Sequence, residues 1–429
     1  MKKALRITLV LILLLLLTVG AFSCKNPWKK DKYVSYTMDV RSDGTFKILQ
    51  ITDMHLINAT YTNDDVELDV SLRDEWAMEC VSTVINEAKP DMIMVTGDSV
   101  YCLDQVSKVR HFSSDNEACF RKFADFIDSF KIPWAFCFGN HDEEGDVKRK
   151  ATIKYDKTLA KKELSAYLTS GDLKYCMYVD GPDEINGVGN YIINVLNKNG
   201  SVNNAIVIMD SGSYLGADDW KYEYVHDDQL DWYERAIKHI ALKNQTLNVS
   251  SIIFQHIPFN EYRYALERYI GALTVLGEDW KATIKPDGTG TERSIESEGE
   301  TITYHGGVYN EGEICASYIG DYKGNYYDGG HEFERILKLG STQAVFCGHD
   351  HRNTFSFTYK GVRLTYGMSV DYSANGLTPL KENQRIFEET VQRGGTLITL
   401  HADSSVGIEQ IHFDRNLYQE ELVKRGQAS

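Results

Sequence analysis

Five short apolar runs recur along the chain, and a polar cluster closes each of them. The runs are rich in β-branched, aromatic and other apolar side chains, a pattern typical of a strand buried on both faces. They cover residues 46–52, 91–96, 134–138, 250–254 and 343–347. Helices are predicted between these runs at residues 66–88, 117–130, 152–168, 227–242 and 332–339. The alternation of strands and helices predicts an α/β fold that begins with right-handed parallel units.

The rest of the chain shows a weaker pattern. Residues 175–210 and 354–413 read as strands separated by turns. Between residues 261 and 330, Gly, Glu, Asp and Tyr are abundant and the apolar spacing is irregular. A stretch of this length inside a compact domain is usually functional or a packed excursion. We therefore predict one domain at residues 35–429, with an irregular insertion around 261–330 that lies near the functional site.

The first residues have the pattern of an export signal. A basic start precedes an apolar run at residues 7–22, which is short for a membrane-spanning helix. Residues 20–24 resemble the lipobox of bacterial lipoproteins, in which Cys24 would carry the lipid. We predict a signal peptide at residues 1–23 and a tether at 24–34. The protein is then exported and lipid-anchored to the outer side of a bacterial membrane, and an uncleaved signal anchor is the alternative.

The net charge and the cysteine spacing exclude several kinds of partner and site. The formal net charge is −16, and no strong basic cluster occurs beyond the N-terminal segment. We therefore expect no nucleic-acid partner, no nuclease activity, and contact with a membrane through the lipid anchor only. The eight cysteines form no C-x-x-C pair, so no thiolate metal site is predicted. An anionic substrate would need a local positive centre, which bound metal ions could supply.

The polar clusters themselves carry the candidate chemistry. They are Asp53-Met54-His55, Gly97-Asp98, Gly139-Asn140-His141-Asp142, Gln255-His256 and Gly348-His349-Asp350-His351. Taken alone, each cluster is more often a helix cap, a turn or a structural histidine than a metal ligand. Together they deliver metal-binding side chains to the strand ends, where α/β sheets place their sites. Their joint occurrence predicts a site for two metal ions.

The order D-x-H, G-D, G-N-H-D, lone H, G-H-x-H resembles the signature of calcineurin-like metallophosphoesterases. Segments 255–258 (Gln-His-Ile-Pro) and 348–351 (Gly-His-Asp-His) are similar to the purple-acid-phosphatase-like branch of that family. The resemblance implies a four-layer αββα sandwich of two mixed β-sheets flanked by helices. It also implies two divalent or trivalent ions. Manganese, iron and zinc all remain open, because imidazole and carboxylate ligands do not select among them.

The resemblance assigns roles to individual residues. One metal would take Asp53, His55 and His351, the other Asn140, His256 and His349, and Asp98 would bridge both. A water between the ions would be acidified to a pKa near roughly 7, and the resulting hydroxide would attack phosphorus. His141 would be the general acid for the leaving oxygen or a donor to phosphate. Asp142 could orient the His141 imidazole, and a simple turn cap is the alternative.

One position departs from the purple acid phosphatases proper. There, glycine replaces the histidine of the first motif, and a tyrosine three residues after the bridging aspartate binds ferric iron. This chain has both His55 and Tyr101. One coordination position cannot take both, and the complete D-x-H motif favours His55. We expect Tyr101 to be a packing residue or a substrate-side contact.

The predicted function is metal-dependent hydrolysis of a phosphoric ester in a small molecule, with monoester and diester both open. The alternative is a catalytically inactive, surface-anchored binding lipoprotein on the same fold. The complete ligand set and His141 favour the enzyme, since a binding scaffold has no physical need for all of them.

Overall fold

The computed structural model describes residues 31–57, 70–101, 116–143, 157–214, 222–284, 290–309, 318–320, 326–328, 331–373 and 393–413. The predicted signal peptide, Cys24 and most of the tether lie outside these residues. None of the helices in the described part of the chain is long and apolar enough to cross a bilayer.

The larger of two mixed sheets has nine strands. In spatial order they are β1 (Val34–Asp39), β5 (Tyr191–Leu196), β6 (Val202–Ile208), β7 (Ser251–Phe254), β12 (Thr342–Cys347), β14 (Val362–Tyr366), β13 (Ser356–Tyr359), β9 (Glu300–Tyr304) and β8 (Arg293–Ser297). Strands β6, β7, β12 and β14 run parallel to one another. Their carboxyl ends therefore meet at one edge of the sheet.

The smaller sheet has five strands. In order they are β16 (Val406–His412), β15 (Gly394–Leu400), β2 (Phe46–Ile51), β3 (Met92–Val95) and β4 (Trp134–Phe136). Strands β2, β3 and β4 are parallel, whereas β15 and β16 pair antiparallel. Two short strands, β10 (Tyr318–Gly320) and β11 (Tyr326–Asp328), pair separately.

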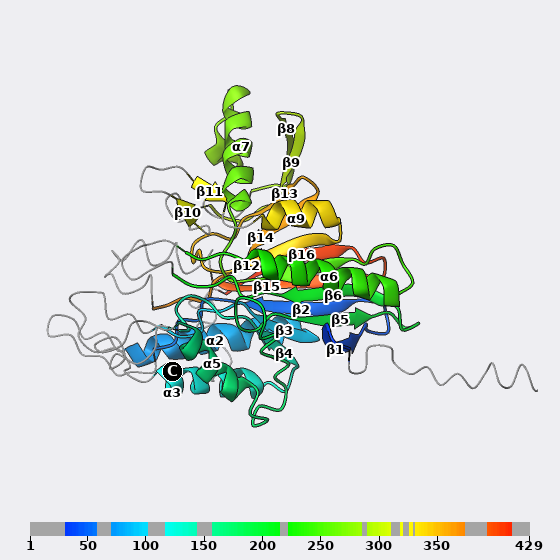
Figure 1. Ribbon diagram of the computed structural model, residues 1–429. Helices are drawn as coiled ribbons and strands as arrows, with labels where there is room; N and C mark the ends of the chain where they lie inside the picture. The colour runs from blue at the N-terminus through cyan, green and yellow to red at the C-terminus, as the bar shows by residue number, and fades with distance from the viewer. Residues whose placement is uncertain are drawn as a thin grey trace, which may run out of the picture.

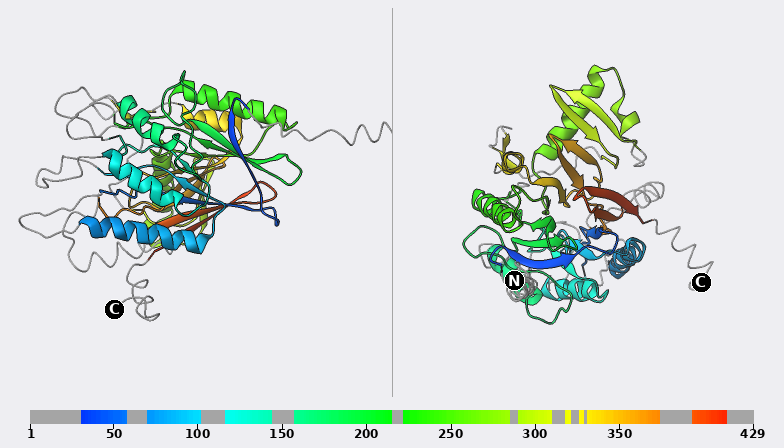
Figure 2. Two further views of the ribbon diagram at one scale, coloured as in Figure 1. Left: turned by 90° about the horizontal axis from the view of Figure 1, so that it is seen from below. Right: turned by 90° about the vertical axis from the view of Figure 1, so that its right-hand side faces the viewer.

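Helices cover the outer faces of the two sheets (Figure 1 and Figure 2). One side carries α2 (Val70–Ala88), α3 (Asn116–Asp128) and α5 (Lys157–Leu168); the other carries α6 (Asp227–Lys243), α7 (Glu261–Val275), the short α8 (Trp280–Thr283) and α9 (Glu332–Leu339). Alternate residues of β7 enter different cores: Ile252 and Phe254 pack with the small sheet, and Ile253 packs with the core of α6. This two-sided burial explains the apolar runs and gives the predicted four-layer sandwich.

The segment at 261–330 differs from its prediction as irregular. It contains α7 and the β8–β9 hairpin, which extends the large sheet through β13 (Figure 1). The buried positions of α7 do follow a helical spacing: Tyr262, Ala265, Leu266, Tyr269 and Leu273. Two of them are tyrosines, so the sequence looked too polar for a core-facing helix.

Candidate metal centre

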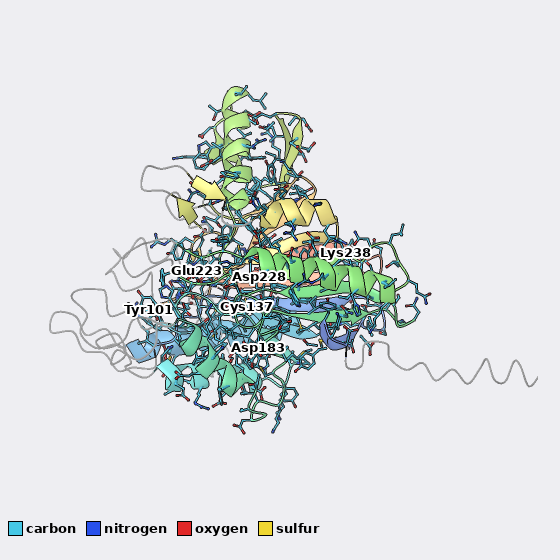
Figure 3. All side chains as sticks on the ribbon, viewed as in Figure 1. Tyr101, Cys137, Asp183, Glu223, Asp228 and Lys238 are labelled. Carbon is cyan, nitrogen blue, oxygen red and sulfur yellow. The ribbon has the colours of Figure 1, made fainter. Side chains whose placement is uncertain are left out.

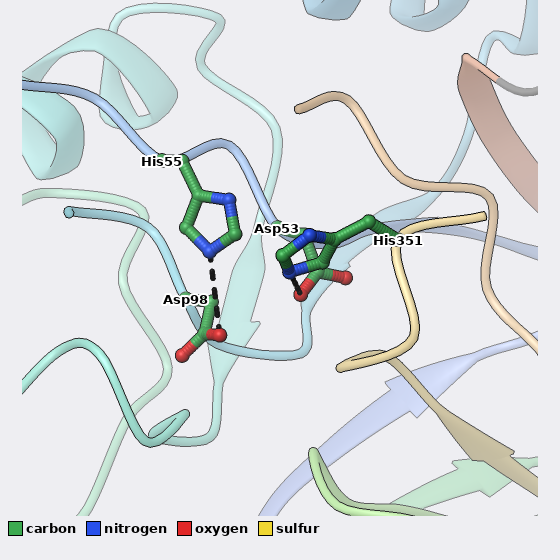
Figure 4. Close-up of side chains that lie close together, drawn as sticks. All are labelled: Asp53, His55, Asp98 and His351. Atoms are coloured by element: carbon green, nitrogen blue, oxygen red, sulfur yellow. Dashed lines mark hydrogen bonds and ion pairs between the residues drawn. The ribbon is translucent and has the colours of Figure 1, made fainter. Parts of the chain in front are cut away.

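The sandwich brings six of the seven predicted metal ligands into two groups. Ligand atoms of Asp53, His55, Asp98 and His351 lie within 4.8 Å of one another, and so do those of Asp98, His256 and His349. The first group comes from loops that follow β2, β3 and β12 (Figure 4). Asp98 belongs to both groups, which is the arrangement a bridging carboxylate requires.

The contacts place Asp98 between two imidazoles. Asp98 Oδ2 lies 3.3 Å from His55 Nε2 and 3.1 Å from His256 Nε2. Asn140, the seventh predicted ligand, joins the second group, because its Oδ1 is 3.1 Å from His256 Nε2. On the other side, His351 Nε2 is 3.6 Å from Asp53 Oδ1.

Left-handed backbone turns the side chains into the centre. Four candidate ligands have positive φ: Asp53 (53°), His55 (47°), Asp98 (51°) and His349 (77°). Such angles cost on the order of 1–3 kcal/mol each for a non-glycine residue and gather at functional sites. The glycines of the motifs allow the ligand-bearing loops to pack closely against one another. A Cβ on Gly97 would meet the backbone of Gly139, and a Cβ on Gly139 would meet the Asp98 carboxylate.

Hydrogen bonds hold the far ends of several ligands. His256 Nδ1 lies 2.6 Å from the Thr96 carbonyl oxygen and donates to it, which leaves Nε2 for the centre. The Thr52 hydroxyl donates to Asp53 Oδ2 at 2.8 Å. The Asn140 amide nitrogen donates to the Tyr214 hydroxyl at 2.8 Å, so the amide oxygen faces His256. Such outer contacts fix the orientation of metal ligands.

The histidine His349 tests whether the centre fits metal ions. It is buried, and both of its ring nitrogens lack a hydrogen-bond partner in the described part of the chain. Burial and the nearby His256 imidazole hold the pKa of His349 well below its usual range. It is therefore a neutral imidazole with buried, unsatisfied nitrogens, the form in which histidine binds a metal. The donor set fits two ions that share Asp98.

The charges of the centre reinforce one another. Burial disfavours the Asp98 carboxylate, but the His256 and His141 imidazoles outweigh it and hold the pKa of Asp98 well below its usual range. Burial likewise opposes the His256 imidazolium, and Asp98 overrides it and raises the pKa of His256 to about 9. Burial raises the pKa of Asp53 to about 6. Of the two candidate carboxylate ligands, Asp98 is thus the one that its surroundings favour in the ionised form.

His141 lies beside the two groups and belongs to neither. Its Nε2 is 3.9 Å from Asp98 Oδ2, and its ring packs 5.1 Å from that of His55. Its backbone N–H donates to Asp98 Oδ1 at 2.8 Å. This anchor fixes the backbone of His141 and leaves its imidazole at the side of the centre.

The side chain of Asp142 contacts the backbone of the ligand-bearing loops. Its carboxylate accepts hydrogen bonds from the backbone N–H groups of Asp98, Ser99 and Gly139 at 2.8–2.9 Å. Burial and the Asp98 charge raise the pKa of Asp142 to about 7, while the three donors favour its ionised form. These contacts are those of a turn cap that also joins the two ligand-bearing loops. The role of Asp142 in orienting the His141 imidazole stays a prediction.

Tyr101 is buried next to the centre, at the edge where the strands end (Figure 3). Its ring centroid lies 5.3 Å from that of His55 and 4.9 Å from that of His141. His55 Nε2 lies 3.3 Å from Asp98 Oδ2, and His55 belongs to the first ligand group. This arrangement agrees with the choice of His55 as the ligand.

We therefore predict that the metal-loaded protein shows no phenolate-to-iron charge-transfer band. Tyr101→Phe should keep both metal ions, because its ring packs beside the ligands, whereas His55→Ala should lose the ion on the Asp53 side. Visible spectroscopy and elemental analysis of both variants test this. An absorption band that disappears in Tyr101→Phe would assign the position to the phenolate instead.

The sequence analysis missed Asp371. This buried carboxylate lies behind the centre, with Oδ1 3.2 Å from His55 Nδ1 and Oδ2 3.5 Å from His351 Nδ1. It follows β14, which ends at the same edge as β12. A polar residue beyond an apolar strand was the available signal, but the parallel direction of β14 could not be read from the sequence.

Comparison with known proteins places the chain in a family. Residues 46–277, just over half of the chain, match the family described as "Calcineurin-like phosphoesterase". "Probable inactive purple acid phosphatase 14" of Arabidopsis thaliana is 26% identical over 376 residues, which are 82% of this chain and 77% of the relative. "Phosphatase DCR2" of Saccharomyces cerevisiae is 27% identical over 51% of this chain and 36% of its own length. A dimetal phosphatase structure from Danio rerio aligns over 86% of this chain and 96% of its own, with 10% identity and a TM-score of 0.43. Because the family match covers more than half of its residues, the chain belongs to the calcineurin-like phosphoesterase family.

Proposed function

We propose that this protein is a two-metal phosphohydrolase that cleaves phosphoric esters of small molecules. The observation that carries the proposal is the position of Asp98, whose carboxylate is shared by two groups of buried ligands. When bound, two ions would supply positive charge for the phosphoryl oxygens and lower the pKa of a water to about 7. Beyond its N-terminal segment, the sequence contains no strong basic cluster that would supply this charge.

The protein side of the mechanism is orientation and proton transfer. Asp53, His55 and His351 would hold one ion, Asn140, His256 and His349 the other, and Asp98 both. The Thr96 carbonyl and Tyr214 hydroxyl keep His256 and Asn140 turned inward. His141 would donate a proton to the leaving oxygen of the ester, because its imidazole lies beside the centre and outside both ligand groups.

A second candidate is a binding protein without catalysis. It is raised by the names of three relatives, which are all "Probable inactive" purple acid phosphatases from Arabidopsis thaliana with 25–26% identity. The hydrolase is supported by this chain's own residues. It retains a ligand set for two ions, four strained backbone positions that point these side chains inward, and His141.

The discriminating experiment compares metal-stripped and reconstituted protein on two substrates. Manganese, zinc or iron should restore hydrolysis of p-nitrophenyl phosphate, a monoester, or of bis(p-nitrophenyl) phosphate, a diester. The preferred substrate assigns the ester class, which the ligands do not, because the same metal pair serves both. Full metal content without hydrolysis of either ester would support the binding protein.

We also propose that Cys24 is lipidated and holds the protein on the outer side of a bacterial membrane. The proposal is supported by the basic start, the short apolar run and the lipobox-like residues before Cys24. Cys24→Ala should prevent lipid attachment, which metabolic labelling with a fatty-acid analogue measures. An uncleaved variant that still fractionates with membranes as the parent does would point to a signal anchor.

A further inference from the structure

We infer that Asp371 is a positioning residue that holds His55 and His351 with their Nε2 atoms turned toward one metal ion. The inference deepens the proposed two-metal function and rests on it. It concerns a residue outside the five sequence clusters, in the segment after β14, a strand that no predicted ligand follows.

The geometry gives each imidazole one oxygen of the same carboxylate. Asp371 Oδ1 is 3.2 Å from His55 Nδ1, and Oδ2 is 3.5 Å from His351 Nδ1. The opposite ring nitrogens face the centre, where His55 Nε2 meets Asp98 and His351 Nε2 meets Asp53. The two rings lie 4.5 Å apart and nearly perpendicular, at 73°. A single carboxylate therefore lies next to the Nδ1 atoms of both histidines that would hold one metal ion.

The backbone around Asp371 is tied in place. Ser373 N–H donates to Asp371 Oδ1 at 2.8 Å, and Asp371 N–H donates to Ser369 Oγ at 3.1 Å. Val370 N–H reaches across to the other sheet and donates to the Thr52 carbonyl oxygen at 3.1 Å. Thr52 immediately precedes Asp53. This hydrogen bond therefore fixes the position of the Asp371 loop relative to the loop that carries the ligands Asp53 and His55.

The chemistry requires an acceptor on both sides. A carboxylate can accept an Nδ1–H from each imidazole, which selects the tautomer whose Nε2 lone pair is free for metal. An asparagine of the same shape has one acceptor oxygen and one donor nitrogen. In Asp371→Asn one of the two histidines therefore faces a donor and loses this orientation.

The other metal position is held differently. His256 donates to the neutral Thr96 carbonyl, and Asn140 donates to the Tyr214 hydroxyl. No contact joins Asp371 to these residues among the described contacts of the centre. Asp371→Asn should thus act on the ion of His55 and His351, and Tyr214→Phe offers a matched control that touches the opposite side.

Calorimetric titration of the metal-stripped full chain with Mn²⁺ tests the inference. The unaltered protein should bind two ions. Asp371→Asn should weaken one binding event by about 10–100-fold, the usual effect of an outer partner of a metal ligand, and spare the other. Tyr214→Phe should spare the event that Asp371→Asn weakens. Histidine-selective ¹⁵N NMR of the protein loaded with diamagnetic Zn²⁺ supplies a readout that general destabilisation does not move: Asp371→Asn should alter the Nδ1–H signals of His55 or His351.

The titration distinguishes a failure of the two-metal site from a failure of the role of Asp371. An unaltered protein that binds no Mn²⁺ would contradict the two-metal site itself. Two ions bound equally well by the unaltered protein and by Asp371→Asn, with unchanged histidine signals, would overturn the role of Asp371 alone. Loss of the same binding event in Tyr214→Phe would also overturn it, because the effect would then not be confined to the side that Asp371 contacts.

Discussion

Asp98→Asn is expected to cause the largest loss, removing metal from both positions and hydrolysis with it. Asp98 is the one residue that belongs to both ligand groups, and its Oδ2 lies 3.1–3.3 Å from an imidazole of each. The amide keeps the shape of the side chain but lacks the negative charge and offers only one oxygen. Bridging two cations with it is unfavourable, so the fall in metal affinity should exceed the ~10–100-fold typical of outer partners.

Elemental analysis and the hydrolysis rate at a fixed metal concentration measure this effect. Asp172→Asn is a matched control, because Asp172 is exposed and, within the described residues, its side chain accepts a hydrogen bond from the Ser170 hydroxyl. Circular dichroism should show that both variants fold. Asp98→Asn protein that retains two ions and its full rate would refute the bridging role.

His141→Ala is expected to lower turnover by roughly 10²–10⁴ while leaving the metal content intact, the usual range for a lost general acid. His141 Nε2 lies 3.9 Å from Asp98 Oδ2 and outside both ligand groups, so its removal deletes no predicted ligand. His141→Ala should therefore lower the rate without loss of metal, whereas Asp98→Asn should lower both.

The leaving group supplies the control for His141. A nitrophenolate leaves without a proton, so the defect of His141→Ala should shrink on p-nitrophenyl phosphate relative to an alkyl phosphate. Equal losses on both substrates would assign His141 to binding of the phosphoryl group. Loss of metal would identify it as a ligand.

The fold was predictable where burial alone sets the pattern. Strand β7 lies within the predicted run 250–254, and helix α9 matches the predicted residues 332–339. A strand buried on both faces and a short amphipathic helix leave clear apolar patterns in the sequence. Helix α7 was not predicted from the sequence, because two of its buried positions are tyrosines, Tyr262 and Tyr269. A tyrosine ring can fill a core position while its hydroxyl makes the sequence look polar.

The candidate site was predictable where a ligand directly follows its strand. The residues that contact the ligands from behind were not predictable, because they come from loops that only the folded sandwich brings together. Asp371 reaches His55 because residues after β14 pair with Thr52 after β2, in the other sheet. Asp142 bonds to the backbone of Asp98 and Ser99, which belong to a different loop. The three backbone donors to Asp142 include two from that loop, which its position in the sequence could not indicate.

The most direct test measures metal content and hydrolysis on the same samples as the stripped protein is reloaded stepwise. We expect no activity without metal, and hydrolysis of a phosphoric ester that rises until about two ions are bound per chain. Protein that binds no transition metal, or that holds two ions and hydrolyses neither monoester nor diester, would contradict a two-metal phosphohydrolase built around Asp98.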